Sequence, residues 1–341
     1  MAYTTIDNPE LYFQCKIWSG NNTDDTAITL DGDENMQPDF IWTKRRNAST
    51  NHDLWDAVRG ALKQIASNNN ESEATISSSV KSFDSDGFTV GTNSNLNASG
   101  GTYVAWCWKE SATAGFDIVS YTGNGSNRTL SHGLSQKPDM IIIKRRNTTG
   151  NWTVYHSTLT VSKYIYLHLT NAADTGGASS YWQTSEPTSS VVSLGTDGDV
   201  NGSSDTYISY FFCNKQGFSK FGSYTGNGNA DGSYIHLGFR PAFVIFKRSD
   251  GGTENWGIID STRSYHNVGN HTLATNSSNP ESSFGGGESV GGASNKVDLL
   301  SNGIKIREAS NYNNTSGATY IYMAFAEAPF VNSKGVPANA R

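Results

Sequence analysis

The chain has 341 residues and a formal net charge of −6, with 35% hydrophobic residues, 16% charged residues and 35 glycines. A chain of this length is longer than a domain with a single hydrophobic core usually is, so two or three domains are expected. The sparse, scattered cations argue against nucleic-acid binding, which needs several phosphate-facing Lys or Arg side chains on one surface. No apolar run reaches the ~18 residues of a membrane span, which argues against membrane insertion.

Three cysteines, Cys15, Cys107 and Cys213, lie in apolar surroundings along the chain. A sparse, odd number of cysteines does not form a disulfide framework, so buried free thiols are expected. The chain is therefore expected to be made in a reducing cytoplasm.

The first repeat is predicted over residues 11–114, after an N-terminal segment of residues 1–10. It begins with a Gly-Asn turn that follows Trp18, which is typical of a strand connection. A short apolar run at 40–43 predicts a buried strand. Apolar residues near helical spacing over 53–68 favour one short helix, with an irregular strand and loop as the alternative. The aromatic run at 102–108 predicts the closing strand.

The same blocks return twice in the same order, over residues 115–216 and 217–330. The Gly-Asn turns follow Tyr121 and Tyr224, and apolar runs ending in Lys-Arg come after Pro138 and Pro241. Ordered recurrence of several blocks indicates that three units share one fold. Short strands with polar turns favour an all-β chain of three tandem antiparallel β-sandwich domains of jelly-roll or lectin-like type, followed by a C-terminal tail, 331–341.

Large apolar residues in these blocks are expected to form the core of each repeat. The tryptophans of the third block are interpreted as equivalent to one another, and core packing is the expected role of such aromatic residues. The expected core residues are Trp55, Trp152, Trp256, Phe40, Met140 and Phe243.

One stretch of the second repeat resembles the first nine positions of a calcium-binding loop. Asp197, Asp199, Asn201 and Asp205 supply oxygen ligands at alternate positions around Gly202. The bidentate Glu that completes such a loop is missing, so a hairpin turn is the favoured interpretation and calcium the alternative. No histidine or cysteine spacing indicates zinc.

A few aromatic residues lie in polar stretches that have no partner in the other repeats. Tyr181 and Trp182 are the main candidates for gripping the face of a sugar, with Tyr265 and Tyr312 as weaker ones. A loop anchor is the alternative role for Tyr181 and Trp182.

The sequence contains no nucleophile elbow, phosphate loop or dinucleotide fingerprint. Glycoside hydrolysis needs two carboxylates facing each other across a cleft. Glu110 and Glu327 recur at matching positions, but Asn214 takes that place in the middle repeat. We therefore expect no enzymatic activity and no cofactor.

The Tyr-Thr-Gly-Asn-Gly turn, the strand ending in Lys-Arg, the tryptophan block and the closing aromatic strand together resemble a family of virion proteins of marine bacteriophages. The resemblance runs from about Leu11 to Phe330. It implies a non-enzymatic structural component of a phage particle, made in the host cytoplasm and located in the virion.

A tail fibre or appendage that contributes to host attachment is the first role implied by the resemblance. The alternatives are a capsid-surface fibre or decoration protein, a carbohydrate-binding module and a glycan depolymerase. The expected partners are other virion proteins, a host surface glycan and copies of the chain itself in a homotrimer. Three repeats could instead imitate a trimer within one chain.

Overall fold

The computed structural model describes residues 3–269, 271–281 and 296–337. The fold is all-β and its sheets are antiparallel, which confirms the predicted class. In these ranges helical structure is confined to short pieces: η1 (Pro9–Leu11), α1 (Ser94–Asn97), α2 (Ala178–Trp182) and α3 (Gly198–Asn201). Among the described residues, no helix has the length and apolar character that crossing a membrane requires.

We call residues 11–114, 115–216 and 217–330 modules 1, 2 and 3. Module 1 contains one large and one small sheet. In order across the large sheet, the strands are β1 (Phe13–Ser19), β9 (Thr102–Trp108), β3 (Phe40–Arg45), β4 (His52–Asp56), β5 (Lys63–Ala66) and β6 (Ala74–Thr75). Those of the small sheet are β2 (Thr26–Ile28), β8 (Gly87–Val90) and β7 (Val80–Asp84).

Modules 2 and 3 have the same plan. In module 2 the large sheet is β10 (Phe116–Thr122), β16 (Thr206–Phe212), β12 (Met140–Arg145), β13 (Trp152–His156) and β14 (Ile165–Tyr166), and the small sheet is β11 (Arg128–Ser131) and β15 (Val191–Leu194). In module 3 the large sheet is β17 (Ser219–Thr225), β24 (Thr319–Pro329), β19 (Phe239–Arg248), β20 (Gly257–Asp260) and β21 (Leu273–Ala274). The small sheet of module 3 is β18 (Tyr234–His236), β23 (Gly303–Ile306) and β22 (Val297–Leu300).

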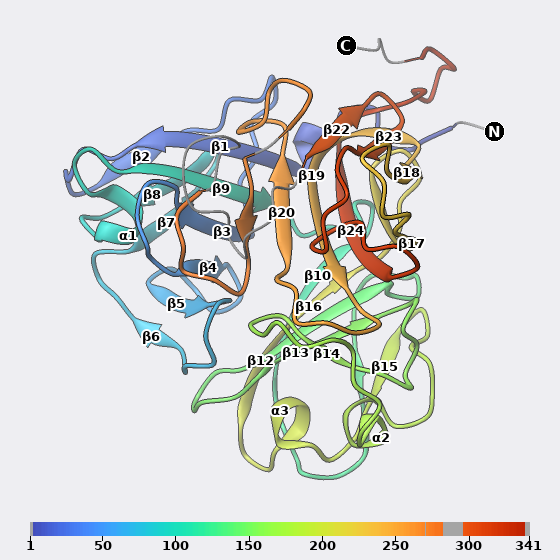
Figure 1. The fold of residues 1–341 in the computed structure, drawn as a ribbon. Helices are drawn as coiled ribbons and strands as arrows, with labels where there is room; N and C mark the ends of the chain where they lie inside the picture. Colours follow the sequence, from blue (N-terminus) through green and yellow to red (C-terminus); the bar gives the residue numbers. More distant parts are fainter. Residues whose placement is uncertain (1–2, 270, 282–295, 338–341) are drawn as a thin grey trace.

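In all three large sheets the first and last strands of the module pair with each other, and the last strand also pairs with the third. The fourth and fifth strands then follow in sequence order. The module boundaries fall where the last strand of one module ends and the first strand of the next begins. Figure 1 shows the blue-to-teal, green-to-yellow and orange-to-red modules grouped around a shared centre.

A common core joins the inner faces of the three large sheets. Trp108, Phe212 and Phe325 occupy the same position on the last strand of their modules and meet there. Their ring centroids are 6.5 Å apart for Trp108 and Phe212, 6.0 Å for Phe212 and Phe325, and 5.6 Å for Trp108 and Phe325. Because equivalent residues form a closed triangle, the modules are related by an approximate threefold axis that passes through it.

The other face of each large sheet packs on the small sheet of the same module. In module 1 this outer core includes Met36, Trp55 and Phe88, and in module 2 it includes Tyr155 and Trp182. Residues on both faces of the central strands are therefore buried, which explains why these strands are continuous apolar runs rather than alternating ones. Each module is sandwich-like, with one face turned to the shared centre.

The predicted helix over 53–68 is wrong. This stretch forms β4, a turn and β5, and the turn contains Gly60 and Leu62 at φ +90° and +68°, in the left-handed region that ends any helix. Leu54 faces the common core and Trp55 faces the outer core. The apolar spacing thus reflects burial on two sides of a strand and not one side of a helix.

The segment before β1 reaches across to module 3 and closes the ring of modules. Ile6 is buried in the common core, and the Tyr3 hydroxyl donates to the Gly238 carbonyl at 2.9 Å. Asp7 accepts a hydrogen bond from the Ser333 amide at 2.7 Å. The N-terminal segment and the start of the C-terminal tail therefore lie together on one side of module 3 (Figure 1).

Candidate functional site

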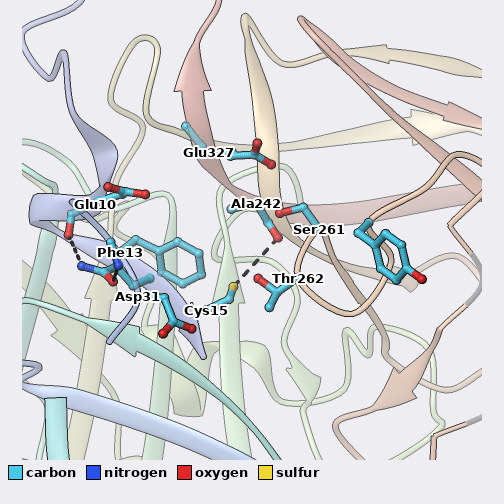
Figure 2. Close-up of a pocket in the computed structure, with 12 residues that line it drawn as sticks. Glu10, Phe13, Cys15, Asp31, Ala242, Ser261, Thr262 and Glu327 are labelled. Carbon is cyan, nitrogen blue, oxygen red and sulfur yellow. Dashed lines mark hydrogen bonds between the residues drawn. The ribbon is translucent and has the colours of Figure 1, made fainter. Parts of the chain in front are cut away.

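A pocket of about 340 Å³ opens where module 1 meets module 3. Strand β1 contributes Phe13 and Cys15, and β24 contributes Glu327. The turn after β20 contributes Ser261 and Thr262, and Figure 2 shows these hydroxyls across the pocket from the labelled residues of module 1. The pocket exists only because the modules close into a ring, since its walls come from opposite ends of the chain.

The pocket carries three carboxylates, and each has a partner. Asp31 pairs with Lys16, and Glu327 pairs with Arg240 at 3.0 Å. Glu10 accepts the backbone N–H of Asp33 at 2.9 Å. Paired carboxylates, hydroxyls and an aromatic rim form a lining that suits a neutral, polyhydroxylated ligand.

Tyr265 lines this pocket with 64% of its surface exposed. It is the one glycan candidate from the sequence whose ring is available to stack on a ligand. The nearby Cys15 thiol is not an activated nucleophile, because burial and the charge of Asp260 raise its pKa well above the ordinary value.

The prediction that the other aromatic candidates grip a sugar face is wrong. Tyr181, Trp182 and Tyr312 are 6%, 0% and 1% exposed, so none of them presents a ring to solvent. Tyr181 and Trp182 lie in α2, where Trp182 packs edge-on against Tyr155 in the outer core of module 2. Polar neighbours in the sequence suggested an exposed loop, but the small sheet covers these rings.

The acidic residues of the suggested calcium loop each bind a different partner and do not converge on one point. Asp197 caps α3 by accepting the Asp199 N–H at 2.8 Å, and Asp199 accepts two hydrogen bonds from Asn151. Asp205 pairs with Arg145 at 3.1 Å. Over the part of the chain that the structure describes, no group of three or more His, Cys, Asp or Glu side chains is placed to hold a metal ion.

Asn201, the remaining residue of that loop, is fully buried and anchors the first turn of its module. Its carbonyl oxygen accepts the Asn124 N–H at 3.0 Å, and its amide donates to Ser126 and Gly195. Asn97 and Asn314 hold the equivalent turns of modules 1 and 3 in the same way. The Gly-Asn turns seen in the sequence are thus fixed by a buried asparagine from a distant part of the module, which is the last residue of α1 in module 1 and of α3 in module 2.

The six expected core residues, Trp55, Trp152, Trp256, Phe40, Met140 and Phe243, are all buried. The three tryptophans are nevertheless not equivalent. Trp152 pairs in register with Lys144, as His52 does with Lys44, whereas Trp55 pairs with Ile41. The equivalent of Trp55 in module 2 is therefore Tyr155. Trp152 and Trp256 lie between modules, where their indole N–H groups donate to the Ala66 and Tyr166 carbonyls, each at 2.9 Å.

Modules 1 and 2 meet through a buried ionic network. Asp56 accepts the Arg59 side chain at 2.5 Å and the Tyr210 hydroxyl at 2.7 Å. Arg59 also contacts Glu73 at 3.3 Å, and Glu73 binds Arg146 of module 2 through both oxygens. The Arg59 and Asp56 side chains are fully buried, so each depends on the other for its charge to be compensated.

The same network recurs where module 3 meets module 1. Asp260 accepts Arg263 at 2.5 Å and the Trp106 indole N–H at 2.9 Å. Glu281 contacts Arg263 at 3.2 Å and Arg46 of module 1 at 2.6 Å. Each residue of this network stands at the position of its counterpart in the other.

The junction between modules 2 and 3 is built without this network. His156 stands at the place of Asp56 and contacts the Tyr322 carbonyl at 3.2 Å. Leu159 replaces the arginine, and Ser249 stands where Arg46 and Arg146 stand, with its carbonyl accepting the Ala173 N–H. Burial lowers the pKa of His156 to about 4, so this side chain carries no charge near pH 7.

A lysine precedes the half-buried arginine at the end of each third strand and is itself buried at a junction. Lys144 donates to the Asn70 carbonyl of module 1 and Lys247 to the Thr170 carbonyl of module 2, while Lys44 bonds the turn that follows it. Burial lowers the pKa of all three lysines to about 8. The Lys-Arg endings seen in the sequence are thus parts of the junctions.

Sequence reasoning missed the acidic residues of these networks. Their signal was the pattern Asp-x-x-Arg, which occurs at Asp56 and Arg59 and again at Asp260 and Arg263. The middle repeat lacks the pattern, so it did not stand out among the recurring blocks.

Comparison with known proteins gives a family without an assigned activity. No curated protein matches the chain, and no solved structure matches it. One protein-family model matches residues 8–329, which span all three modules as a single region. The chain therefore belongs to the family described as domain of unknown function DUF7483.

Proposed function

We propose that the chain is a non-enzymatic structural and attachment protein of a bacteriophage particle. In this proposal the modules are three jelly-roll sandwich domains that together take the place of a homotrimer, and no cofactor is needed. The observation that supports it is the closed triangle of Trp108, Phe212 and Phe325, because a single chain that replaces a homotrimer needs such a threefold arrangement of its modules. The likeness to marine phage virion proteins supplies the biological setting.

The placement of the charged residues supports a structural role. Two ion pairs with fully buried side chains, Asp56 with Arg59 and Asp260 with Arg263, face neighbouring modules and not a cavity. Such pairs hold a fixed arrangement of modules, because separating them would leave uncompensated charges. A rigid arrangement of modules suits a protein that must present a surface outside a cell.

Two measurements test this proposal. Light scattering of the purified chain should give a monomer of 36.9 kDa, whereas a trimer would contradict the internal imitation of a trimer. Mass spectrometry of purified particles of a phage that encodes the chain should detect its peptides. Their absence from the particle would overturn the virion role, and immunogold labelling would separate a tail position from the capsid-surface alternative.

A carbohydrate-binding module is the second candidate, and the pocket beside Tyr265 favours it. On a glycan array, Tyr265→Ala should lose the signal of the wild-type chain, because an exposed ring at a pocket rim stacks on sugar faces. Tyr234→Ala is the matched control, since Tyr234 is 46% exposed but does not line the pocket. Equal binding by both variants would remove this role for the pocket.

A glycan depolymerase remains the third candidate because Glu10, Asp31 and Glu327 line one pocket. The pairing of each carboxylate favours a binding site over a pair of catalytic acids. Incubation with bacterial surface polysaccharide should release no oligosaccharide. Release that Glu327→Gln abolishes would replace the non-enzymatic proposal.

A further inference from the structure

A second pocket, of about 310 Å³, lies in module 1 on the far side of β5 from the common core, at a place that the other modules fill. The strand register places Gln64 and Ala66 of module 1 at the positions of Tyr164 and Tyr166 of module 2. Ser79 stands at the position of Tyr181, because the carbonyls of these two residues accept the N–H groups of the equivalent glycines Gly91 and Gly195. In module 2, Tyr164 stacks on Tyr181 with ring centroids 4.0 Å apart, and the hydroxyls of Tyr166 and Tyr181 are 2.8 Å apart.

Module 3 fills the same place with a different ring. Tyr312 stands at the position of Asn95 and is buried, and Gly257 stands at the position of Asp53. A Cβ atom on Gly257 would lie 2.7 Å from the Tyr312 ring, so the glycine makes room for the tyrosine. Among the described residues, module 1 has no aromatic ring at any of these positions, whereas module 2 has three and module 3 has Tyr312.

The opened space in module 1 is arranged around a buried carboxylate. Asp53 is 1% exposed and accepts hydrogen bonds from the side-chain amides of Gln64 and, at 2.8 Å, Asn95. These bonds orient both amides with their N–H groups toward Asp53. Their carbonyl oxygens therefore face away from it, and no described residue donates a hydrogen bond to either oxygen.

The rest of the lining adds further polar groups and a small apolar wall. Asn93 and Glu71 line the pocket beside the two amides, and Ile76 supplies the apolar part. The loop that carries Asn69 and Asn70 is held by module 2, because Asn69 accepts the Trp152 indole N–H at 3.0 Å. The pocket wall is thus fixed in place before any ligand arrives.

We propose that this pocket binds a neutral, hydroxyl-rich sugar residue. The free amide carbonyls and the Glu71 carboxylate accept hydrogen bonds, and sugar hydroxyls can donate to them. Ile76 can contact the C–H face of a sugar ring, and the volume of about 310 Å³ suits one sugar residue, since small-molecule pockets begin at about 300 Å³. The carboxylates of Asp53 and Glu71 disfavour acidic sugars. This inference concerns a different site from the Tyr265 pocket and does not depend on particle membership.

The test uses the full chain and isothermal titration calorimetry with glucose, galactose, mannose and N-acetylglucosamine, and with glucuronate as the acidic comparison. At least one neutral sugar should bind with a stoichiometry of about one, and glucuronate should bind at least tenfold more weakly. Ala74→Trp should weaken that binding at least tenfold, because Ala74 is exposed and lines the pocket mouth on β6. Thr75→Trp is the matched control, since neighbouring residues of a strand point to opposite faces.

The proposal is overturned if no neutral sugar binds to the wild-type chain. It is also overturned if Ala74→Trp binds as well as the wild type does. Both variants should melt at the wild-type temperature, because both positions are exposed on an edge strand. Tyr265→Ala should retain the binding, which separates this pocket from the one between modules 1 and 3.

Discussion

Replacing Asp56 by Asn tests whether the ionic networks hold the ring of modules together. The change keeps the shape of the side chain but removes the charge that faces Arg59 at 2.5 Å. Arg59 is fully buried and would keep only Glu73, at 3.3 Å, as a charged partner. Breaking a buried pair by removing one partner costs about 3–5 kcal/mol. With an unfolding slope of about 3 kcal/mol per molar urea, the midpoint should fall by at least about 1 M.

Tryptophan fluorescence and far-UV circular dichroism in urea measure this shift, and coincident curves show whether the modules unfold together. His156→Asn is the matched control, because it places the same residue at the equivalent position of the junction that lacks the ionic network. It removes the imidazole contacts with the Tyr322 carbonyl and with Thr158, none of which is an ion pair, and should cost about 1–2 kcal/mol. Asp260→Asn should behave like Asp56→Asn. Equal midpoints for the Asp56 and His156 variants would refute the assignment of the networks to ring closure.

Trp152→Phe should lower the free energy of unfolding by about 1 kcal/mol more than Trp55→Phe does in the same urea assay, because the Trp152 indole N–H donates a hydrogen bond and the Trp55 indole N–H has no partner among the described residues. Equal losses would contradict this. Burial lowers the folded pKa of Lys144 to about 8, below its ordinary 10.5, so the folded chain binds fewer protons between these values. Stability relative to Lys144→Met should therefore rise from pH 7.5 to 9.5, and a flat difference would show that this lysine titrates normally. Hydrogen bonding and charge from Arg146 and Arg59, outweighing burial, lower the folded pKa of Glu73 below its ordinary 4.5. The advantage of the wild type over Glu73→Gln should be present above pH 4.5 and shrink as the pH falls through the lower folded pKa, whereas an advantage that persists at acid pH would be independent of the charge. Treatment with a chelator should leave the melting temperature unchanged, and a shift reversed by calcium would restore a metal site.

The sequence alone determined the all-β class and the recurrence of one strand pattern in three units. Both are local properties: the turn after Tyr121, the run after Pro138 and the aromatic closing strand each show their structure within a few residues. Prediction from the local sequence pattern was wrong where a strand is buried on both of its faces. The stretch that contains Leu54 and Trp55 had helical spacing because each residue serves a different core.

The tertiary structure decided which residues have a role beyond the core. Asp56 and Tyr210 meet across two modules although 154 positions separate them in the chain, and no local pattern predicts that contact. Likewise, Tyr181 lies in a polar stretch and Gln64 in one with many apolar residues, yet the Tyr181 ring is buried in its module and the Gln64 side chain lines a pocket. The physical reason is that burial and pairing depend on what the other modules place opposite a side chain, which the ring of three sheets determines and the neighbouring residues in the sequence do not.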